Sequence, residues 1–299
     1  MTDIRLSTPV IPDALPFSIS LKDRIMVLGS CYADAIAGKL KAAGFDVMVN
    51  PLGTLYNPAS VRSTILRLSR DGLFTAEDCV EMGAGAGKIC SYEHHTSFAR
   101  TTEDEFLSNA NARLTEAREF WRQCTRVIIT YGNSHIWEPV SPERRSRLLT
   151  GAVSNCLKRP AADFTRRMLP VAETASLTSA SILENPDKKF IFAVSPIRHL
   201  SDGAHTNSLS KASLLLGVNA AISGCDNACY FPAFEIIMDE LRDYRFYAED
   251  MIHPSETAVE IIWYRFREAA TPQSEQLLID AAERESRRNA HIEKDSARD

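Results

Sequence analysis

The segment Arg24-Ile-Met-Val-Leu-Gly-Ser-Cys-Tyr-Ala33 decides the fold of this chain of 299 residues. Its apolar run stops at Gly29, and from Ala33 apolar residues recur at helical spacing until Gly44, where a helix is expected to end. The pattern predicts a strand, a turn and a helix. At the turn, Ser30 is predicted to expose its hydroxyl beyond the sheet, beside free helix amides that favour an oxyanion. Ser30 is therefore a candidate nucleophile, and the alternative is a helix N-cap serine.

A base for this serine is offered near the other end of the chain. Asp250-Met-Ile-His253-Pro254 places a carboxylate three residues before a histidine. This spacing lets the acid fix the imidazole tautomer while the other ring nitrogen faces the serine. The alternative is a surface histidine that precedes a helix starting near Pro254. Together, Ser30, Asp250 and His253 indicate serine-hydrolase chemistry.

Further β-rich runs alternate with amphipathic segments. Two of these segments, Ser210 to Ile222 and Phe234 to Leu241, suit crossover helices. The chain therefore predicts an α/β fold with a largely parallel sheet of about five strands, covered on both faces, with functional groups beyond the strands' C-terminal ends. The four further strands are predicted at Phe45 to Val49, Val127 to Thr130, Phe190 to Val194 and Ala228 to Phe231.

The length suits one large domain, which we expect to span residues 1–270. Residues 70–98 lack apolar periodicity and are predicted to form an inserted loop or cap over the functional edge of the sheet. Residues 271–299 are predicted to form a charged C-terminal helix or tail.

Composition indicates a soluble protein of the cytoplasm. The net charge of -5 and the pI near 5.9 argue against a nucleic-acid partner, which needs a concentrated basic surface. The one basic cluster, Arg144-Arg145-Ser-Arg147, is expected to be a solvated face. No stretch approaches the roughly 20 apolar residues of a membrane helix, and the start does not read as a secretory signal. Seven scattered cysteines favour a reducing cytoplasm over a disulfide framework.

Two motifs that suggest a cofactor or a metal do not satisfy their patterns. Gly83-Ala-Gly-Ala-Gly87-Lys88 lacks the first glycine, the final Ser or Thr and the preceding strand of a phosphate-binding loop. Glu93-His94-His95 offers adjacent side chains that diverge in regular structure, and no third ligand has suitable spacing. We therefore expect neither a cofactor nor a required metal.

The segment Gly29-Ser-Cys-Tyr-Ala33 resembles the signature of the GSCFA family, with Tyr32 where the family name has Phe. The resemblance covers residues 20–266, and the family is similar to the SGNH (GDSL-like) hydrolases. It implies a flavodoxin-like three-layer α/β/α fold. The other blocks that resemble the family, in its order, are Asn50-Pro-Leu-Gly-Thr-Leu-Tyr-Asn-Pro58, Asn155-Cys156 with Pro160 and Phe164, Ser195-Pro-Ile-Arg-His199, Asn207-Ser-Leu-Ser-Lys211 and Asp250-Met-Ile-His-Pro254.

The resemblance implies Ser30 as nucleophile, His253 as general base and Asp250 as its orienting acid. It also implies an oxyanion hole made by the backbone amides of Ser30 and Gly53 and by an asparagine side chain. Asn133 stands one residue before the position at which the SGNH pattern places that asparagine, which here is Ser134.

Asn57, in the loop of Gly53, is a rival donor for the oxyanion, and the choice between Asn57 and Asn133 stays open. Tyr56, His135 and His199 are candidate substrate-binding residues. His199 follows a predicted strand and has the chemistry to hydrogen-bond a sugar hydroxyl or an acyl carbonyl. Cys31, beside Ser30, is expected to be a small packed hydrophobe.

The expected function is that of a metal-independent serine esterase that removes small acyl groups, above all acetyl, through an acyl-enzyme. The resemblance suggests a small-molecule or carbohydrate ester as substrate. Two alternatives remain open: an O-acyltransferase that uses the same three residues, and a non-catalytic carbohydrate-binding protein on the same fold.

Overall fold

A five-stranded sheet in which every neighbouring pair runs parallel forms the centre of the protein. The computed structural model describes residues 7–296, with side chains as far as residue 290. The strand order is β2-β1-β5-β8-β9, which is the flavodoxin-like order 2-1-3-4-5 when only the strands of this sheet are numbered. These strands are β1 (Arg24–Gly29), β2 (Asp46–Val49), β5 (Arg126–Tyr131), β8 (Lys189–Val194) and β9 (Ala228–Tyr230).

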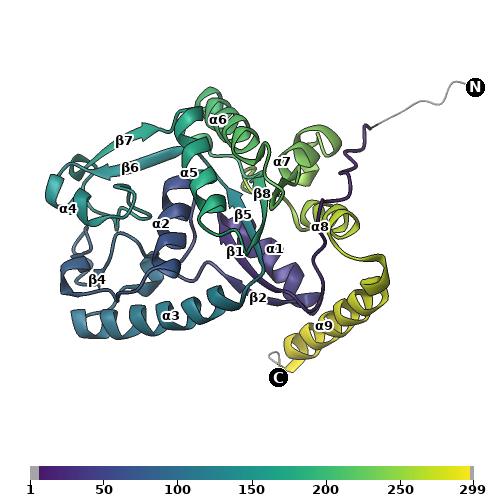
Figure 1. Cartoon of the computed structure of the whole chain (residues 1–299), viewed down its shortest axis with the longest axis horizontal. Helices are drawn as coiled ribbons and strands as arrows, with labels where there is room; N and C mark the ends of the chain where they lie inside the picture. The colour runs from purple at the N-terminus through teal and green to yellow at the C-terminus, as the bar shows by residue number, and fades with distance from the viewer. Residues whose placement is uncertain (1–6, 297–299) are drawn as a thin grey trace, which may run out of the picture.

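Helices cover both faces of the sheet, so the fold is the expected three-layer α/β/α arrangement (Figure 1). Successive strand residues alternate between two cores: Met26 and Leu28 pack into one, while Ile25 and Val27 pack into the other. The first core is closed by α2 (Pro58–Ser69), α3 (Glu103–Gln123), α5 (Val171–Leu183) and α6 (Ala204–Ile222). The second is closed by α1 (Cys31–Ala42), α7 (Ala233–Glu235), α8 (Glu256–Ala270) and α9 (Gln276–Ser296).

All five predicted strands are confirmed within a residue or two at each end. The helix predicted over Ser210 to Ile222 is α6, which begins six residues earlier, at Ala204. The prediction of a crossover helix over Phe234 to Leu241 is wrong. This segment follows β9, the last strand, and it combines the short α7 with a π-helical turn at Ile236–Glu240.

Two small antiparallel pairs lie outside the main sheet. One joins β6 (His135–Pro139) to β7 (Phe164–Met168), and α4 (Pro142–Arg147) lies between them in sequence. The other joins β3 (Val80–Glu81) to β4 (Ile89–Cys90) within residues 70–98. That segment contributes Phe74 and Tyr92 to the first core, and His95 donates its amide to the carbonyl of Leu52, beside the loop of Gly53.

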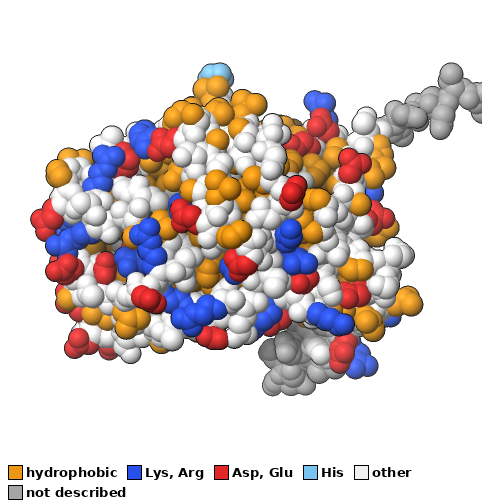
Figure 2. All heavy atoms as spheres, viewed as in Figure 1, with side chains coloured by type: hydrophobic (Ala, Val, Ile, Leu, Met, Phe, Trp, Pro, Cys, Tyr) orange, Lys and Arg blue, Asp and Glu red, His pale blue; other side chains and the backbone are white. Residues whose placement is uncertain are grey.

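Charges of both signs are interspersed on the face seen in Figure 2, with hydrophobic side chains between them. The three arginines of the basic cluster are exposed, and two of them pair with nearby acids: Arg145 with Glu138, and Arg147 with Glu77 and Glu143. Across the described residues, no helix combines the length and the apolarity needed to cross a bilayer.

Candidate active site

The turn between β1 and α1 holds Ser30 in a fixed position. Gly29 has φ +144°, and a Cβ there would lie 2.2 Å from the carbonyl oxygen of Thr130 on β5, so only glycine fits. Ser30 then donates its amide to that same carbonyl oxygen at 3.1 Å. The turn is therefore packed directly against the neighbouring strand.

Ser30 occupies the N-cap position of α1, but its side chain makes no capping hydrogen bond. Its Oγ lies 3.4 Å from Oγ1 of Thr130, and the residue is fully buried. The Ser30 hydroxyl therefore does not cap α1, which was the alternative role for this serine. The hydroxyl is closed off from solvent in this conformation.

Asn50 braces the turn from the end of β2, a role that sequence reasoning missed. Its Oδ1 accepts the amide of Gly29 at 2.9 Å, and its Nδ2 donates to Asp34 of α1 at 2.9 Å. Asn50 adopts a positive φ of 41°, which asparagine tolerates better than most residues. A signal was present in the sequence, since an asparagine before a proline, at the end of a strand, is typical of a tight turn.

The end of β5 lies beside Ser30, because β1 and β5 are neighbours and the strand order reverses between them. In open α/β sheets this reversal is where ligands bind. Gly132 follows β5 here, and a Cβ on it would meet Cβ of Ser30 at 3.2 Å, Nε2 of His199 at 3.2 Å and Cδ1 of Tyr56 at 3.3 Å. Three of the predicted site residues therefore converge on Gly132.

The His199 nitrogen that lies near Gly132 has no hydrogen-bond partner among the described residues. This nitrogen, Nε2, is buried, and the imidazole ring packs edge-on against Tyr56 with centroids 5.9 Å apart. The backbone amide of His199 is fixed by Oδ1 of Asn207 at 2.9 Å. Burial, reinforced by the positive charge of Lys211, lowers the pKa of His199 to about 4. The imidazole is therefore neutral at pH 7.

Lys211 of α6 ties two of the loops together. Its Nζ donates to the carbonyls of Gly132 and Ser195, each at 2.6 Å, and burial lowers its pKa to about 7. The sequence pattern around Lys211 indicates its burial. Lys211, Leu214 and Val218 lie at spacings of three and four residues, and so share one helix face that is buried.

Asp250 and His253 form the predicted acid–imidazole pair. Oδ2 of Asp250 lies 2.6 Å from Nδ1 of His253, while Oδ1 accepts the amides of Ile252 and His253, each at 2.9 Å. The His253 amide, the His253 imidazole and the Ile252 amide together lower the pKa of Asp250 to about 2. The carboxylate therefore stays charged at every working pH and can hold the ring in one tautomer.

The pair is partly open to water, with side-chain exposures of 43% for His253 and 46% for Asp250. It is fastened to the loop of His199 because the Arg198 amide donates to the carbonyl of Ile252 at 3.2 Å. No hydrogen bond joins His253 to Ser30 in the described part of the chain. The predicted contact between Asp250 and His253 is therefore present, and a contact of His253 with Ser30 is not.

The predicted oxyanion donors are less available than expected. The Ser30 amide is bonded to Thr130, and the Gly53 amide donates to the carbonyl of Asn50 at 2.8 Å, so both backbone donors are already engaged. Oδ1 of Asn57 caps α2 by accepting the Ser60 amide at 2.9 Å, and Oδ1 of Asn133 accepts the His135 amide at 3.0 Å. Each asparagine keeps its Nδ2 group for another acceptor. Ser134 is buried against Ser210 and is not a donor to this site.

Among the remaining candidates, Cys31 is less enclosed than expected. Its Sγ lies 3.5 Å from the Tyr56 hydroxyl, so it borders the site as well as packing against the second core. His135 opens β6, and burial together with the nearby charge of Arg166 lowers its pKa. It follows Gly132 by three residues along the chain.

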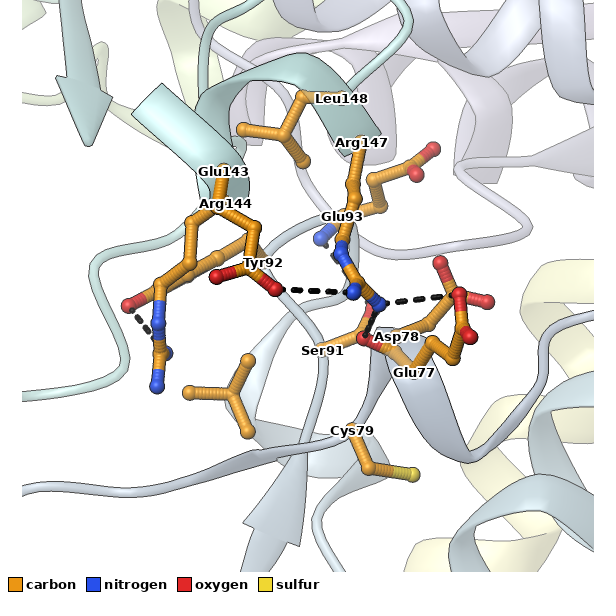
Figure 3. Close-up of a pocket in the computed structure, with 11 residues that line it drawn as sticks. Glu77, Asp78, Cys79, Ser91, Tyr92, Glu93, Glu143, Arg144, Arg147 and Leu148 are labelled. Carbon is orange, nitrogen blue, oxygen red and sulfur yellow. Dashed lines mark hydrogen bonds and ion pairs between the residues drawn. The ribbon is translucent and has the colours of Figure 1, made fainter. Parts of the chain in front are cut away.

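Several cavities lie outside this cluster. A charged cavity of about 240 Å³ lies between α4 and the 3₁₀ turn at Ala76–Asp78, and Arg147 spans it between Glu77 and Glu143 (Figure 3). An apolar cavity of about 330 Å³ lies against the loop of His199 and is lined in part by Ile197, Leu215 and Phe234. The apolar cavity, rather than the charged one, adjoins the predicted site.

The adjacent residues Glu93, His94 and His95 have separate partners. Glu93 accepts hydrogen bonds from Arg67, at 2.6 Å for the shortest, and His94 lies 2.7 Å from the Ser91 hydroxyl. His95 contacts the Ser97 hydroxyl at 3.0 Å instead. The three side chains therefore diverge, as expected from their adjacency.

The parallel sheet between two layers of helices, with Ser30 at its switch point, defines a three-layer α/β/α protein. The model of the GSCFA family matches residues 24–266, so the chain belongs to the GSCFA family. Comparison with curated proteins and with solved structures gives no match.

Proposed function

We propose that this GSCFA protein is a serine esterase, with Ser30 as nucleophile, His253 as general base and Asp250 as the acid that orients it. The observation that carries the proposal is the pair of Asp250 and His253, 2.6 Å apart, on a loop fastened to that of His199, which reaches the Ser30 turn. The uncapped hydroxyl of Ser30 supports it. The family's similarity to SGNH hydrolases gives the same three roles.

The proposed reaction passes through an acyl-enzyme. Oγ of Ser30 bonds to the ester carbonyl carbon as its proton moves to Nε2 of His253, and the carbonyl π pair becomes a lone pair on oxygen. When the carbonyl re-forms, the bond to the alcohol oxygen breaks and the alcohol takes the proton from His253. Water then repeats the sequence, releases the acid and restores Ser30. The three side chains need no metal for these steps.

Access to Ser30 requires a side chain to move. Ser30 is fully buried, and the side chains of Tyr56 and His199 lie beside it at Gly132. An ester carbonyl reaches Oγ once one of these side chains rotates aside. A small acyl group, with acetyl first, suits so confined a position, and a carbohydrate or other polyol is the proposed leaving alcohol.

A non-catalytic carbohydrate-binding role is the second candidate, and two observations favour it. The nucleophile is buried, and both backbone amides expected to bind the oxyanion are already engaged. An O-acyltransferase would use the same acyl-enzyme with another alcohol in place of water.

Hydrolysis of p-nitrophenyl esters from acetate to octanoate tests the proposal, with wild type, Ser30→Ala and His253→Ala measured side by side. We expect turnover of acetate that falls by about 100-fold or more in both variants while their thermal unfolding is unchanged. Preference for longer chains would place the acyl group in the apolar cavity. Labelling by a fluorophosphonate probe, which requires an activated serine, extends the test. A folded wild type that neither turns over any ester nor labels would favour the binding protein.

A further inference from the structure

One ring nitrogen of His199 has no hydrogen-bond partner among the residues that the structure describes. This nitrogen, Nε2, is buried, although a buried polar atom left without a partner costs about 1–3 kcal/mol. The three atoms nearest to a Cβ built on Gly132 are this nitrogen, Cβ of Ser30 and a ring carbon of Tyr56, so the unpaired nitrogen faces the same small space as the Ser30 side chain. This nitrogen therefore points to a ligand atom beside Ser30.

Both backbone amides expected to form the oxyanion hole are engaged elsewhere. Ser30 donates its amide to Thr130 and Gly53 donates its amide to Asn50, so neither is free for an ester oxygen. The amides of Cys31 and Tyr32, in the first turn of α1, have no intrahelical acceptor and supply positive charge near the serine. A side-chain donor opposite the start of α1 would complete the hydrogen-bond donors to the oxyanion.

We propose that His199 donates a hydrogen bond from Nε2 to the carbonyl oxygen of the ester that Ser30 attacks, and so stabilises the oxyanion. This inference rests on the proposed esterase function. His199 keeps its proton throughout, while His253 alone carries the serine proton to the leaving alcohol. His199 thus takes the part that the resemblance assigned to an asparagine.

The division of labour between the two histidines follows from their surroundings. His253 has the carboxylate of Asp250 on Nδ1, which suits a base that becomes positive. Among the described residues no carboxylate is hydrogen-bonded to the His199 ring, and burial, with a smaller effect of Lys211, disfavours a positive imidazole. A neutral imidazole is a weak base but an effective hydrogen-bond donor to a carbonyl.

Three variants test the inference on p-nitrophenyl acetate. In His199→Phe the ring against Tyr56 is kept and the donor is lost, so kcat should fall by about 100- to 1000-fold with little change in KM. His199→Gln has an amide donor and should recover part of that loss. His205→Phe, an exposed histidine on α6, is the matched control and should behave as wild type. Thermal unfolding of all three checks that they fold.

The tautomer of His199 provides a readout that does not need turnover. In ¹⁵N-labelled protein at pH 7, assigned by comparison with His199→Phe, the ring proton should be on Nε2. A proton on Nδ1 would make Nε2 an acceptor for a substrate hydroxyl, and would overturn the inference.

The outcomes separate this inference from the function on which it rests. If wild type turns over acetate, Ser30→Ala does not, and His199→Phe keeps full kcat, only the role of His199 is wrong. A rise in KM alone would make His199 part of the substrate wall, and would also overturn it. If wild type neither turns over any ester nor labels with fluorophosphonate, both proposals fail together.

Discussion

Nζ of the buried Lys211 lies 2.6 Å from the carbonyl oxygen of Gly132, the residue on which the side chains of Ser30, Tyr56 and His199 converge. The same ammonium bonds the carbonyl of Ser195, so one side chain sets the spacing between the loops after β5 and β8. Both residues are buried, and in the described part of the chain Lys211 is the side chain that bonds both carbonyls. Lys211 is therefore a positioning residue for Gly132 and, through the second loop, for His199.

Lys211→Met should lower kcat by about 10- to 100-fold, because the two loops lose their shared donor and small displacements at a reacting centre are costly. Stability should change less, since the lost hydrogen bonds are offset by removal of a buried ammonium. Steady-state kinetics and chemical unfolding of the same preparations check this. If unfolding free energy falls by several kcal/mol while kcat per folded molecule holds, Lys211 serves only the fold.

Gly132→Ala fills the space between the site residues. The new Cβ would lie 3.2 Å from both Cβ of Ser30 and Nε2 of His199, and no backbone strain accompanies it because Gly132 does not have a positive φ. We expect kcat/KM to fall at least about 10-fold with unfolding free energy within about 1 kcal/mol of wild type.

Gly38→Ala is the matched control for this change. Gly38 lies on the exposed side of α1 with nothing within 4 Å of a Cβ, so the variant should gain about 0.5–1 kcal/mol and keep wild-type kinetics. Unchanged kinetics in Gly132→Ala would mean that substrate does not use this space.

Asn50→Ala removes the brace of the nucleophile turn. It leaves the Gly29 amide without its acceptor and places alanine at a positive φ, so we expect a loss of about 2–4 kcal/mol in unfolding free energy. Asn50→Gly removes the same side chain without the backbone cost and should lose about 1–2 kcal/mol less than the alanine variant. Urea unfolding of both measures the two contributions. Equal losses in the two variants would contradict the part given to backbone strain.

Asp250→Asn tests the orienting acid. An amide in this place can still accept from the backbone amides of Ile252 and His253, but it loses the charge that holds the imidazole tautomer. We expect kcat for p-nitrophenyl acetate to fall by about 100-fold or more, with KM little changed. Because the pKa of Asp250 is lowered to about 2, loss of wild-type activity between pH 4 and 6 would not come from this carboxylate. Wild-type kcat in the variant would remove Asp250 from the proposed triad.

Local patterns in the sequence were enough to predict the frame of the fold. The run from Arg24 to Leu28 and the helical spacing after Ser30 gave β1 and α1, and the alternation of strands and helices gave the parallel sheet. The segment after Phe234 was misread because its apolar spacing fits a helix whether it crosses between strands or follows the last one. Only the strand order distinguishes these cases.

The site was less predictable, because hydrogen bonding between distant segments decides which groups are free. Residue type and spacing were enough to select Ser30, Asp250 and His253 as candidates and to predict the contact between Asp250 and His253. Contacts between segments far apart in the sequence bond the Ser30 amide to Thr130. Such contacts also leave Nε2 of His199 without a partner among the described residues. Lys211 and Asn50 act in the same way, through partners that the sequence alone does not reveal.

His94 makes stability depend on pH for a reason separate from the active site. The imidazole lies among Phe74, Phe98 and Phe106, and burial, with a smaller effect of the charge of Arg67, lowers its pKa to about 3. The unfolded chain, with an ordinary histidine pKa of about 6.5, therefore binds a proton first as the pH falls. Since the unfolded state binds more protons between these two values, the free energy of unfolding decreases as the pH falls from about 6.5 to 3.

Between pH 7 and pH 5 this one group should lower the free energy of unfolding by about 2 kcal/mol. His94→Phe suits the aromatic cluster and has no proton to bind, so it should lose about 2 kcal/mol less than wild type over that interval, despite losing the hydrogen bond with Ser91. Above pH 7.5 the difference between the two proteins should be constant, because His94 is then neutral in both states. Urea unfolding at a series of pH values measures both quantities, and parallel curves down to pH 5 would mean that His94 is protonated as readily in the folded protein as in the unfolded chain.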